Sequence, residues 1–192
     1  MRTVARAPLC VAAAALAALL AAGCGGGGSG ERPAAADPPP VPAGYTPVRA
    51  GKVVLAHPNG WTGVAQPPQG WLFGAELRAG ETVEAQVAVI GKVPQVPVAR
   101  LVADAASTGA EFNGAEVRRG GNRPVEIPGA RDAVRVDYTY ATAAGRPSDH
   151  LATDVSVVYG TGSAVVVRIA GLRSRLTPAM VDQVVRTIAI RA

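Results

Sequence analysis

The sequence contains few of the side chains that cross-link a chain, bind metals or carry out catalysis. Its 192 residues include only two cysteines and two histidines. Both cysteines, Cys10 and Cys24, lie near the N-terminus, so the rest of the chain has no thiol for a disulfide or for a thiolate metal site. His57 and His150 lie far apart, and no acidic calcium-binding loop is present. The sequence therefore predicts no metal site and no cofactor.

Aromatic residues are also scarce, at 4% of the chain. Nucleic-acid-binding proteins usually stack bases on aromatic side chains that lie among basic ones, so this composition does not favour a nucleic-acid partner. Trp61 and Trp71 flank the turn at residues 67–70, and Phe73 follows closely. These three side chains either anchor the core or line a binding groove, because buried aromatic residues often carry binding energy.

Long apolar runs are missing as well. The most apolar segment, residues 7–22, is shorter than the roughly 20 residues that a membrane-spanning helix needs. Arg2 and Arg6 precede it, and no acidic residue lies nearby. A basic start followed by a short apolar region is typical of a secretory signal.

The segment Leu20-Ala21-Ala22-Gly23-Cys24 resembles the lipobox of bacterial lipoproteins. The resemblance implies that residues 1–23 are a signal peptide, cleaved before Cys24, and that the thiol of Cys24 carries a diacylglycerol. The protein would then be lipid-anchored on the extracytoplasmic face of the cell membrane. The alternative is an ordinary secretory signal with a chance cysteine. Loss of the signal, with Arg2 and Arg6, lowers the net charge from +5 to +3.

Residues 24–47 form a predicted tether between the anchor and the rest of the protein. Residues 25–30 are glycine and one serine, which form flexible coil, and six prolines between Pro33 and Pro47 favour extended backbone. Neither composition can bury a core. Residues 48–192 are therefore predicted to form one globular domain.

Alternation of apolar and polar residues predicts the strands of this domain. In its first half we expect strands at residues 52–57, 71–77 and 82–90. In its second half we expect short strands near Val117 and at residues 125–127, and longer ones at 133–140, 151–159 and 164–169. The glycine-rich turn at residues 160–163 indicates that the last two strands form a hairpin.

Two segments have the apolar spacing of amphipathic helices. The first is expected to begin near Pro97 and to end near Gly109, and the second begins with Thr177 as N-cap and Pro178 at the first helical position. The apolar stripes are Val98, Leu101, Val102 and Ala105 in the first helix and Val181, Val184, Val185 and Ile188 in the second. Each stripe should cover one face of a sheet.

These elements predict an α+β fold, in which two amphipathic helices cover an antiparallel sheet of about five to seven strands. The layout resembles the PsbP-like fold through the turn Pro58-Asn59-Gly60-Trp61, the turn at residues 128–133 and the closing helix at residues 184–188. In particular it resembles the LpqN-type lipoproteins of mycobacteria and their relatives, over residues 48–192. The resemblance implies an α/β/α sandwich and a binding or accessory protein, and it supplies no catalytic residues.

The strongest candidates for catalytic residues are Ser148 and His150, which lie close together in sequence, and Asp154, which follows them. A serine hydrolase needs a nucleophile, a base and an acid in contact. No Gly-x-Ser-x-Gly elbow is present, and residues adjacent in sequence rarely form that geometry. The simpler interpretation is a solvated loop between two strands.

Arginine is the one prominent charge feature. A candidate basic face consists of Arg118, Arg119, Arg123, Arg131 and Arg135. If this face binds anything, the expected partner is anionic lipid or an anionic cell-wall polymer, because basic residues are attracted to an anionic leaflet. The alternative is an ordinary solvated surface.

Three functions fit these observations. The first is a non-catalytic binding or accessory lipoprotein that docks a protein partner in the cell envelope. The second is a carrier of an apolar envelope lipid, which requires a large apolar cavity. The third is a hydrolase that uses Ser148, His150 and Asp154.

Overall fold

The computed structural model describes residues 37–91, 93, 98–104, 115–141 and 149–191. The predicted signal peptide, Cys24 and most of the tether lie outside the described residues. So do Pro97, Ala105, Gly109 and Ser148. All of the described residues belong to one compact unit, residues 33–192.

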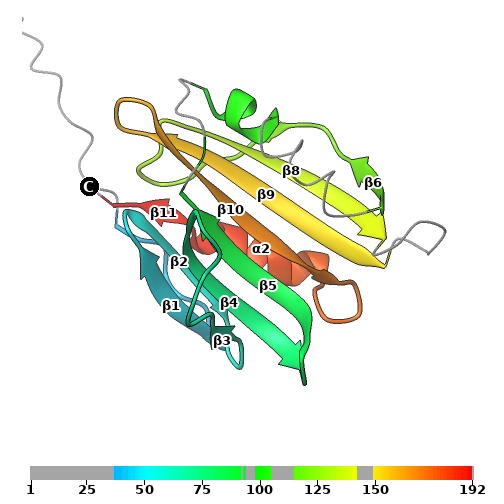
Figure 1. Cartoon of the computed structure of the whole chain (residues 1–192). Coiled ribbons are helices and arrows are strands. Elements are labelled where there is room, and N and C mark those ends of the chain that lie inside the picture. The colour runs from blue at the N-terminus through cyan, green and yellow to red at the C-terminus, as the bar shows by residue number, and fades with distance from the viewer. Residues whose placement is uncertain (1–36, 92, 94–97, 105–114, 142–148, 192) are drawn as a thin grey trace, which may run out of the picture. The chain divides into compact units, whose positions relative to one another are not determined.

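Most strands form one antiparallel sheet (Figure 1). Its order is β3-β4-β5-β10-β9-β8-β6, and β7 also pairs with β8. The strands are β3 (Thr62–Gly63), β4 (Trp71–Ala79), β5 (Thr82–Ile90), β6 (Ala115–Arg119), β7 (Arg123–Pro124), β8 (Asp132–Ala141), β9 (His150–Tyr159) and β10 (Ser163–Leu172). The expected hairpin of β9 and β10 is confirmed, with Tyr159 opposite Ser163.

A second, three-stranded sheet has the order β1-β2-β11. Its strands are β1 (Tyr45–Ala50), β2 (Val53–Pro58) and β11 (Ala189–Ile190). Strand β1 was not anticipated, and it includes Pro47 from the proline-rich segment. Proline is tolerated there because β1 is an edge strand, where one side of the backbone needs no ladder hydrogen bond.

The large sheet separates two buried apolar clusters, which lie on its opposite faces. Strand β8 contributes to both clusters, because its alternating side chains point to the two faces of the sheet in turn, as predicted. Val134, Val136 and Tyr138 belong to one cluster, and Ala133 belongs to the other. The described fold therefore confirms the predicted α+β class, with short edge pairings that bring the large sheet to eight strands.

The closing helix α2 (Pro178–Thr187) is formed as predicted. The Thr177 hydroxyl accepts a hydrogen bond from the backbone N–H of Met180 at 3.2 Å, which satisfies one of the unpaired donors of the first turn. Val181, Val184 and Val185 are buried against the large sheet. In Figure 1, α2 passes behind the strands of the large sheet and lies next to β2.

The first helix differs from its prediction in the face that it buries. Residues 99–104 are helical, but Val98 and Leu101 are 44% and 50% exposed, whereas Ala99, Val102 and Ala103 are buried. The predicted stripe and the buried residues both have the spacing of one helix face, so the apolar pattern does not show which face is buried. The choice is made by Asp132, whose carboxylate accepts a hydrogen bond from the N–H of Ala99 at 2.7 Å. Small side chains at Ala99 and Ala103 then allow close packing on the sheet.

The prediction of a strand at residues 125–127 is wrong, because the strand in this region is β7, which ends at Pro124. Gly129 explains why the chain leaves the sheet here. Its φ of 77° and its position against β11 suit only glycine, since a Cβ would lie 2.1 Å from the carbonyl oxygen of Ile190. The N–H of Ile190 donates to the Pro128 carbonyl at 2.8 Å, which ties this turn to the end of the chain.

Candidate functional site

A groove of about 770 Å³ lies between α2 and the neighbouring face of β8 and β9. We call it the α2 groove. Helix α2 contributes Pro178, Val181, Asp182, Val185 and Arg186. The sheet contributes Arg135, Asp137, Tyr138, Thr139, Leu151, Ala152 and Thr153, and the rim is completed by Arg123, Val125 and Arg173.

The sequence places these residues together through two periodicities. The α2 residues recur every three or four positions, so they share one helix face. Residues 135, 137 and 139 of β8 share one sheet face, and the register sets Asp137 opposite Thr153 and Thr139 opposite Leu151. The groove therefore combines apolar side chains, such as Val125, Val181 and Val185, with polar and charged ones.

A network of charged side chains crosses the middle of the groove. The Arg135 guanidinium donates from Nε to Asp137 Oδ1 at 2.9 Å and from Nη1 to Asp182 Oδ1 at 2.5 Å. The Thr153 hydroxyl donates to Asp137 Oδ1 at 2.6 Å, and Arg123 also forms an ion pair with Asp137. Arg135 therefore joins the sheet directly to α2.

The environment keeps this network ionised. Burial would raise the pKa of Asp137, but the hydrogen bonds from Thr153 and Arg135 and the charges of Arg135 and Arg123 outweigh it and lower that pKa. Burial likewise opposes the charge on Arg135, yet its bonds to Asp182 and Asp137 raise its pKa. Asp137 and Arg135 therefore both remain charged well below neutral pH.

The groove has an excess of positive charge. Its described lining contains four arginines and two aspartates. Arg123 and Arg135 are engaged by the aspartates, whereas Arg173 and Arg186 have no carboxylate within ion-pair distance among the described residues. No histidine, cysteine, serine or lysine occurs among the described lining residues. This arrangement can recognise a ligand, and its two carboxylates, Asp137 and Asp182, are both held in ion pairs with arginine.

The three candidate groove aromatics lie elsewhere. Trp61 is 7% exposed and belongs to the core cluster that includes α2. Phe73 is partly buried against that cluster and stacks on His57, with ring centroids 6.0 Å apart. The Trp71 ring lies over Gly74, where a Cβ would be 3.0 Å from it. None of the three lines the α2 groove, so a groove formed by them stays a prediction.

The five arginines of the candidate basic face lie on different elements. Arg118 and Arg119 are in β6, Arg123 is in β7, Arg135 is in β8, and Arg131 is in the loop before β8. Arg119 pairs with Asp104 at 2.9 Å, in addition to the pairs already described for Arg123 and Arg135. Three of the five charges are thus matched by carboxylates, and the binding of an anionic surface by this set stays a prediction.

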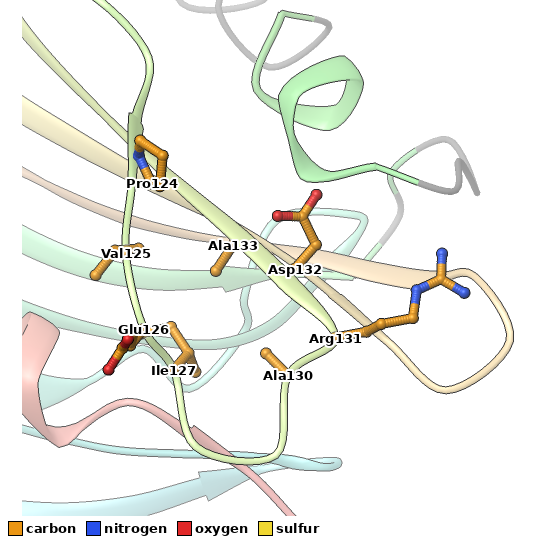
Figure 2. A pocket seen from close by; sticks show the side chains of 8 residues that line it. All are labelled: Pro124, Val125, Glu126, Ile127, Ala130, Arg131, Asp132 and Ala133. Carbon is orange, nitrogen blue, oxygen red and sulfur yellow. The ribbon is translucent and has the colours of Figure 1, made fainter.

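Two smaller hollows also lie on the described surface. One, of about 460 Å³, is lined by residues 124–127 and 130–133 (Figure 2). In that view the Asp132 carboxylate is directed toward the first helix, which it caps, and the Arg131 side chain extends away from the sheet. The other, of about 350 Å³, lies where Pro38, Pro39 and Val41 meet the three-stranded sheet.

The two described candidate hydrolase residues, His150 and Asp154, are not in contact with each other. Asp154 is fully buried and is held by Arg168 through two bonds of 2.8 and 2.7 Å, which raise the pKa of Arg168. His150 Nδ1 lies 2.6 Å from Asp149 Oδ1, and its ring is 4.9 Å from that of Tyr140. His150 and Asp154 are four residues apart on one strand, roughly 13 Å at 3.3 Å per residue. They cannot form the contact that a hydrolase requires.

Among the described residues, no group of three or more His, Cys, Asp or Glu residues is placed to hold a metal ion. No helix in the same residues is long and apolar enough to span a membrane.

Sequence reasoning did not find the α2 groove. Arg135, Asp137 and Thr139 alternate along the strand predicted at residues 133–140, and Asp182 lies in the sequence segment predicted to form the closing helix. The contact between Arg135 and Asp182 spans 47 positions, and it depends on how α2 is set on the sheet. No local pattern specifies that setting.

Comparisons with known proteins agree with the fold. No protein-family model matches the chain, and no curated protein matches it in sequence. The structure is similar to cyanobacterial PsbP (CyanoP) from Synechocystis sp. PCC 6803, with a TM-score of 0.55 and 13% identity over 78% of this chain and 94% of that one. It is also similar to the Ran-binding protein Mog1p of Saccharomyces cerevisiae, with a TM-score of 0.52 and 11% identity over 76% and 95% of the two chains.

LpqN of Mycobacterium tuberculosis, described as involved in cell envelope biogenesis, matches with a TM-score of 0.49 and 14% identity over 77% of this chain and 91% of that one. Likeness at these identities concerns the fold alone. The fold is therefore PsbP-like, as predicted, and membership of the LpqN-type lipoproteins stays a prediction.

Proposed function

We propose that this protein is a non-catalytic binding protein of the cell envelope, lipid-anchored through Cys24 on the extracytoplasmic face of the membrane. Its binding surface in this proposal is the α2 groove. The observation that carries the proposal is the groove itself, which combines apolar side chains, a fixed ion-pair network and two arginines that have no carboxylate partner among the described residues.

The composition of the groove supports recognition of a partner. Arg135 is held at both ends by carboxylates, so the centre of the groove is ordered before any ligand arrives. Such preorganisation lowers the entropic cost of binding. The same fold occurs in a Ran-binding protein of yeast, which shows that it can serve a binding protein without naming a partner for this chain.

The sequence supports the anchor. A basic start, a short apolar run and a cysteine after Leu20-Ala21-Ala22-Gly23 form the pattern that lipoproteins share. The tether that follows would keep the domain close to other membrane proteins while allowing it to reach them. Confinement of this kind raises the effective concentration of the partner.

The two alternatives have less support in the described residues. A carrier of an apolar lipid needs a cavity with few charges, whereas six charged residues line the α2 groove. A hydrolase needs His150 and Asp154 in contact, and each is engaged with another residue. Neither alternative has an observation that favours it over recognition of a partner.

The proposal is tested by site-specific photocrosslinking in the cells that make the protein. A photoreactive amino acid replaces Thr139 in the groove or, as a matched control, the exposed Thr161 in the turn between β9 and β10. We expect a discrete crosslinked adduct from position 139, identified by mass spectrometry, and none from position 161. Equal labelling from both positions, or none from position 139 in a folded protein, would show that the groove is not the binding surface.

A further inference from the structure

Arg173 and Arg186, which have no carboxylate partner among the described residues, lie at opposite ends of the α2 groove. Arg186 is in the last turn of α2, and its described hydrogen bond goes to the neutral Gln183 side chain, at 2.5 Å. Arg173 follows β10, where its backbone N–H donates to the Asp149 carbonyl at 2.8 Å and holds it beside the start of β9. Both side chains are exposed.

The direction of α2 fixes which end each arginine occupies. Ile190, just after the helix, is bonded to Pro128, which precedes β8, and Arg135 near the start of β8 is bonded to Asp182. Helix α2 therefore runs antiparallel to β8. Its last turn, with Arg186, lies toward the start of β8, and its first turn lies toward Thr139 and Leu151, near Arg173.

The length of the groove limits the shape of its ligand. The lining positions of α2 extend from residue 178 to residue 186, which is about 12 Å at 1.5 Å per residue. An extended polypeptide advances about 3.3 Å per residue, so about four residues cover this length. The lining also includes Val125, Val181 and Val185, which suit small apolar side chains of a ligand.

We propose that the α2 groove binds an extended acidic segment of a partner protein, with carboxylates near its two ends received by Arg173 and Arg186. This inference rests on the proposed function and specifies the chemistry of the partner. Charge complementarity argues for it, since four arginines and two aspartates leave a net charge of +2 in the groove. Arginine also binds carboxylates through paired hydrogen bonds.

An anionic lipid headgroup fits the groove less well than an acidic peptide. A headgroup concentrates its charge at one point, whereas the two arginines are separated by the length of the groove. The arginines closest to each other, Arg123 and Arg135, are already bonded to Asp137. A ligand that satisfies both ends at once must therefore carry separated charges.

The test measures binding of a fluorescein-labelled peptide of alternating Glu and Ala to the full-length protein, by fluorescence anisotropy at low ionic strength. The comparison peptide has Gln in place of Glu. The groove variant is Arg173→Glu with Arg186→Glu, and the matched variant is Lys52→Glu with Arg100→Glu. The latter makes the same change in net charge at exposed positions in the turn between β1 and β2 and in the first helix. Circular dichroism verifies that both variants fold.

We expect saturable binding of the acidic peptide, weaker by about tenfold or more in the groove variant and changed by less than about twofold in the matched variant. Equal losses in both variants would mean non-specific attraction and would overturn the proposal. So would equal binding of the Gln peptide, or no binding at all. Displacement of the peptide by equimolar glycerol phosphate would assign the site to phosphate headgroups instead.

Failure of this test can be distinguished from failure of the proposed function. If the photoreactive residue at position 139 still gives a specific protein adduct, the groove binds a partner whose binding segment is not acidic. If neither experiment gives a signal, the groove is not a binding surface.

Discussion

Asp137 shows how single residues set the electrostatics of the candidate site. Its carboxylate is only partly exposed, and it accepts hydrogen bonds from Arg135 and Thr153 while pairing with Arg123. These contacts exist only in the folded protein. They lower the pKa of Asp137 in the folded state relative to the unfolded chain, whose value is about 3.9.

We predict that Asp137→Asn lowers the free energy of unfolding at neutral pH by on the order of 1 kcal/mol, because partial exposure screens the pairs. A carboxylate with a lowered folded-state pKa contributes stability that is present above about pH 4 and is lost as the pH falls through the folded pKa. The difference between wild type and variant should therefore shrink below about pH 4. Urea unfolding over a pH series measures it.

The matched control for this change is Asp104→Asn. Asp104 pairs with Arg119 and is 48% exposed, so its loss should have a smaller effect at every pH. A constant difference between wild type and Asp137→Asn down to the lowest pH would contradict the assigned role of the charge.

At the scale of elements, α2 is the part on which the site depends most. It contributes five of the lining residues, and its position on the sheet decides whether Asp182 meets Arg135. The sequence signals for this helix are unusually complete, with a capping threonine, a proline at the first position and an apolar stripe. That completeness explains why α2 was predicted to the residue at its start.

Replacing the cap gives a prediction for this element. Thr177→Ala removes the hydroxyl that accepts the N–H of Met180 and should lower the free energy of unfolding by about 1 kcal/mol. Thr177→Ser keeps an equivalent acceptor and should remain close to wild type. Thermal unfolding of the two variants measures the difference, and equal stability would show that the cap contributes little.

The first helix is the opposite case. The sequence predicted that a helix forms there, but it did not predict which face of the helix is buried. Its apolar residues fit two helical faces, and the sequence favoured the one with larger side chains. The structure buries Ala99, Val102 and Ala103 instead, because Asp132 fixes the first turn and small residues pack closer to the sheet. A hydrogen bond between residues 33 positions apart cannot be read from local periodicity.

At the scale of the whole molecule, we assign separate functions to two parts of the chain. In this proposal the N-terminal segment supplies the membrane anchor and the tether, and the domain supplies the groove. The fold itself does not determine what is bound. Membrane attachment should therefore depend on Cys24 alone, independently of the groove.

Cys24→Ala should release the protein from the membrane fraction, because the acyl anchor needs that thiol. Cys10→Ala should leave it attached, since Cys10 lies in the predicted signal and is removed with it. Fractionation followed by immunoblotting measures both. Retention of Cys24→Ala on the membrane would exclude the lipobox as the anchor.

The sequence by itself determined the features that arise from neighbouring residues: the longer strands of the large sheet, the start of α2, the hairpin of β9 and β10, and the α+β class. Each follows from a local period or turn. Only the tertiary structure decided which face of the first helix is buried, that β1 begins before the expected start of the domain, and that Arg135 meets both Asp137 and Asp182. These depend on contacts between distant segments, whose register and orientation are fixed by packing.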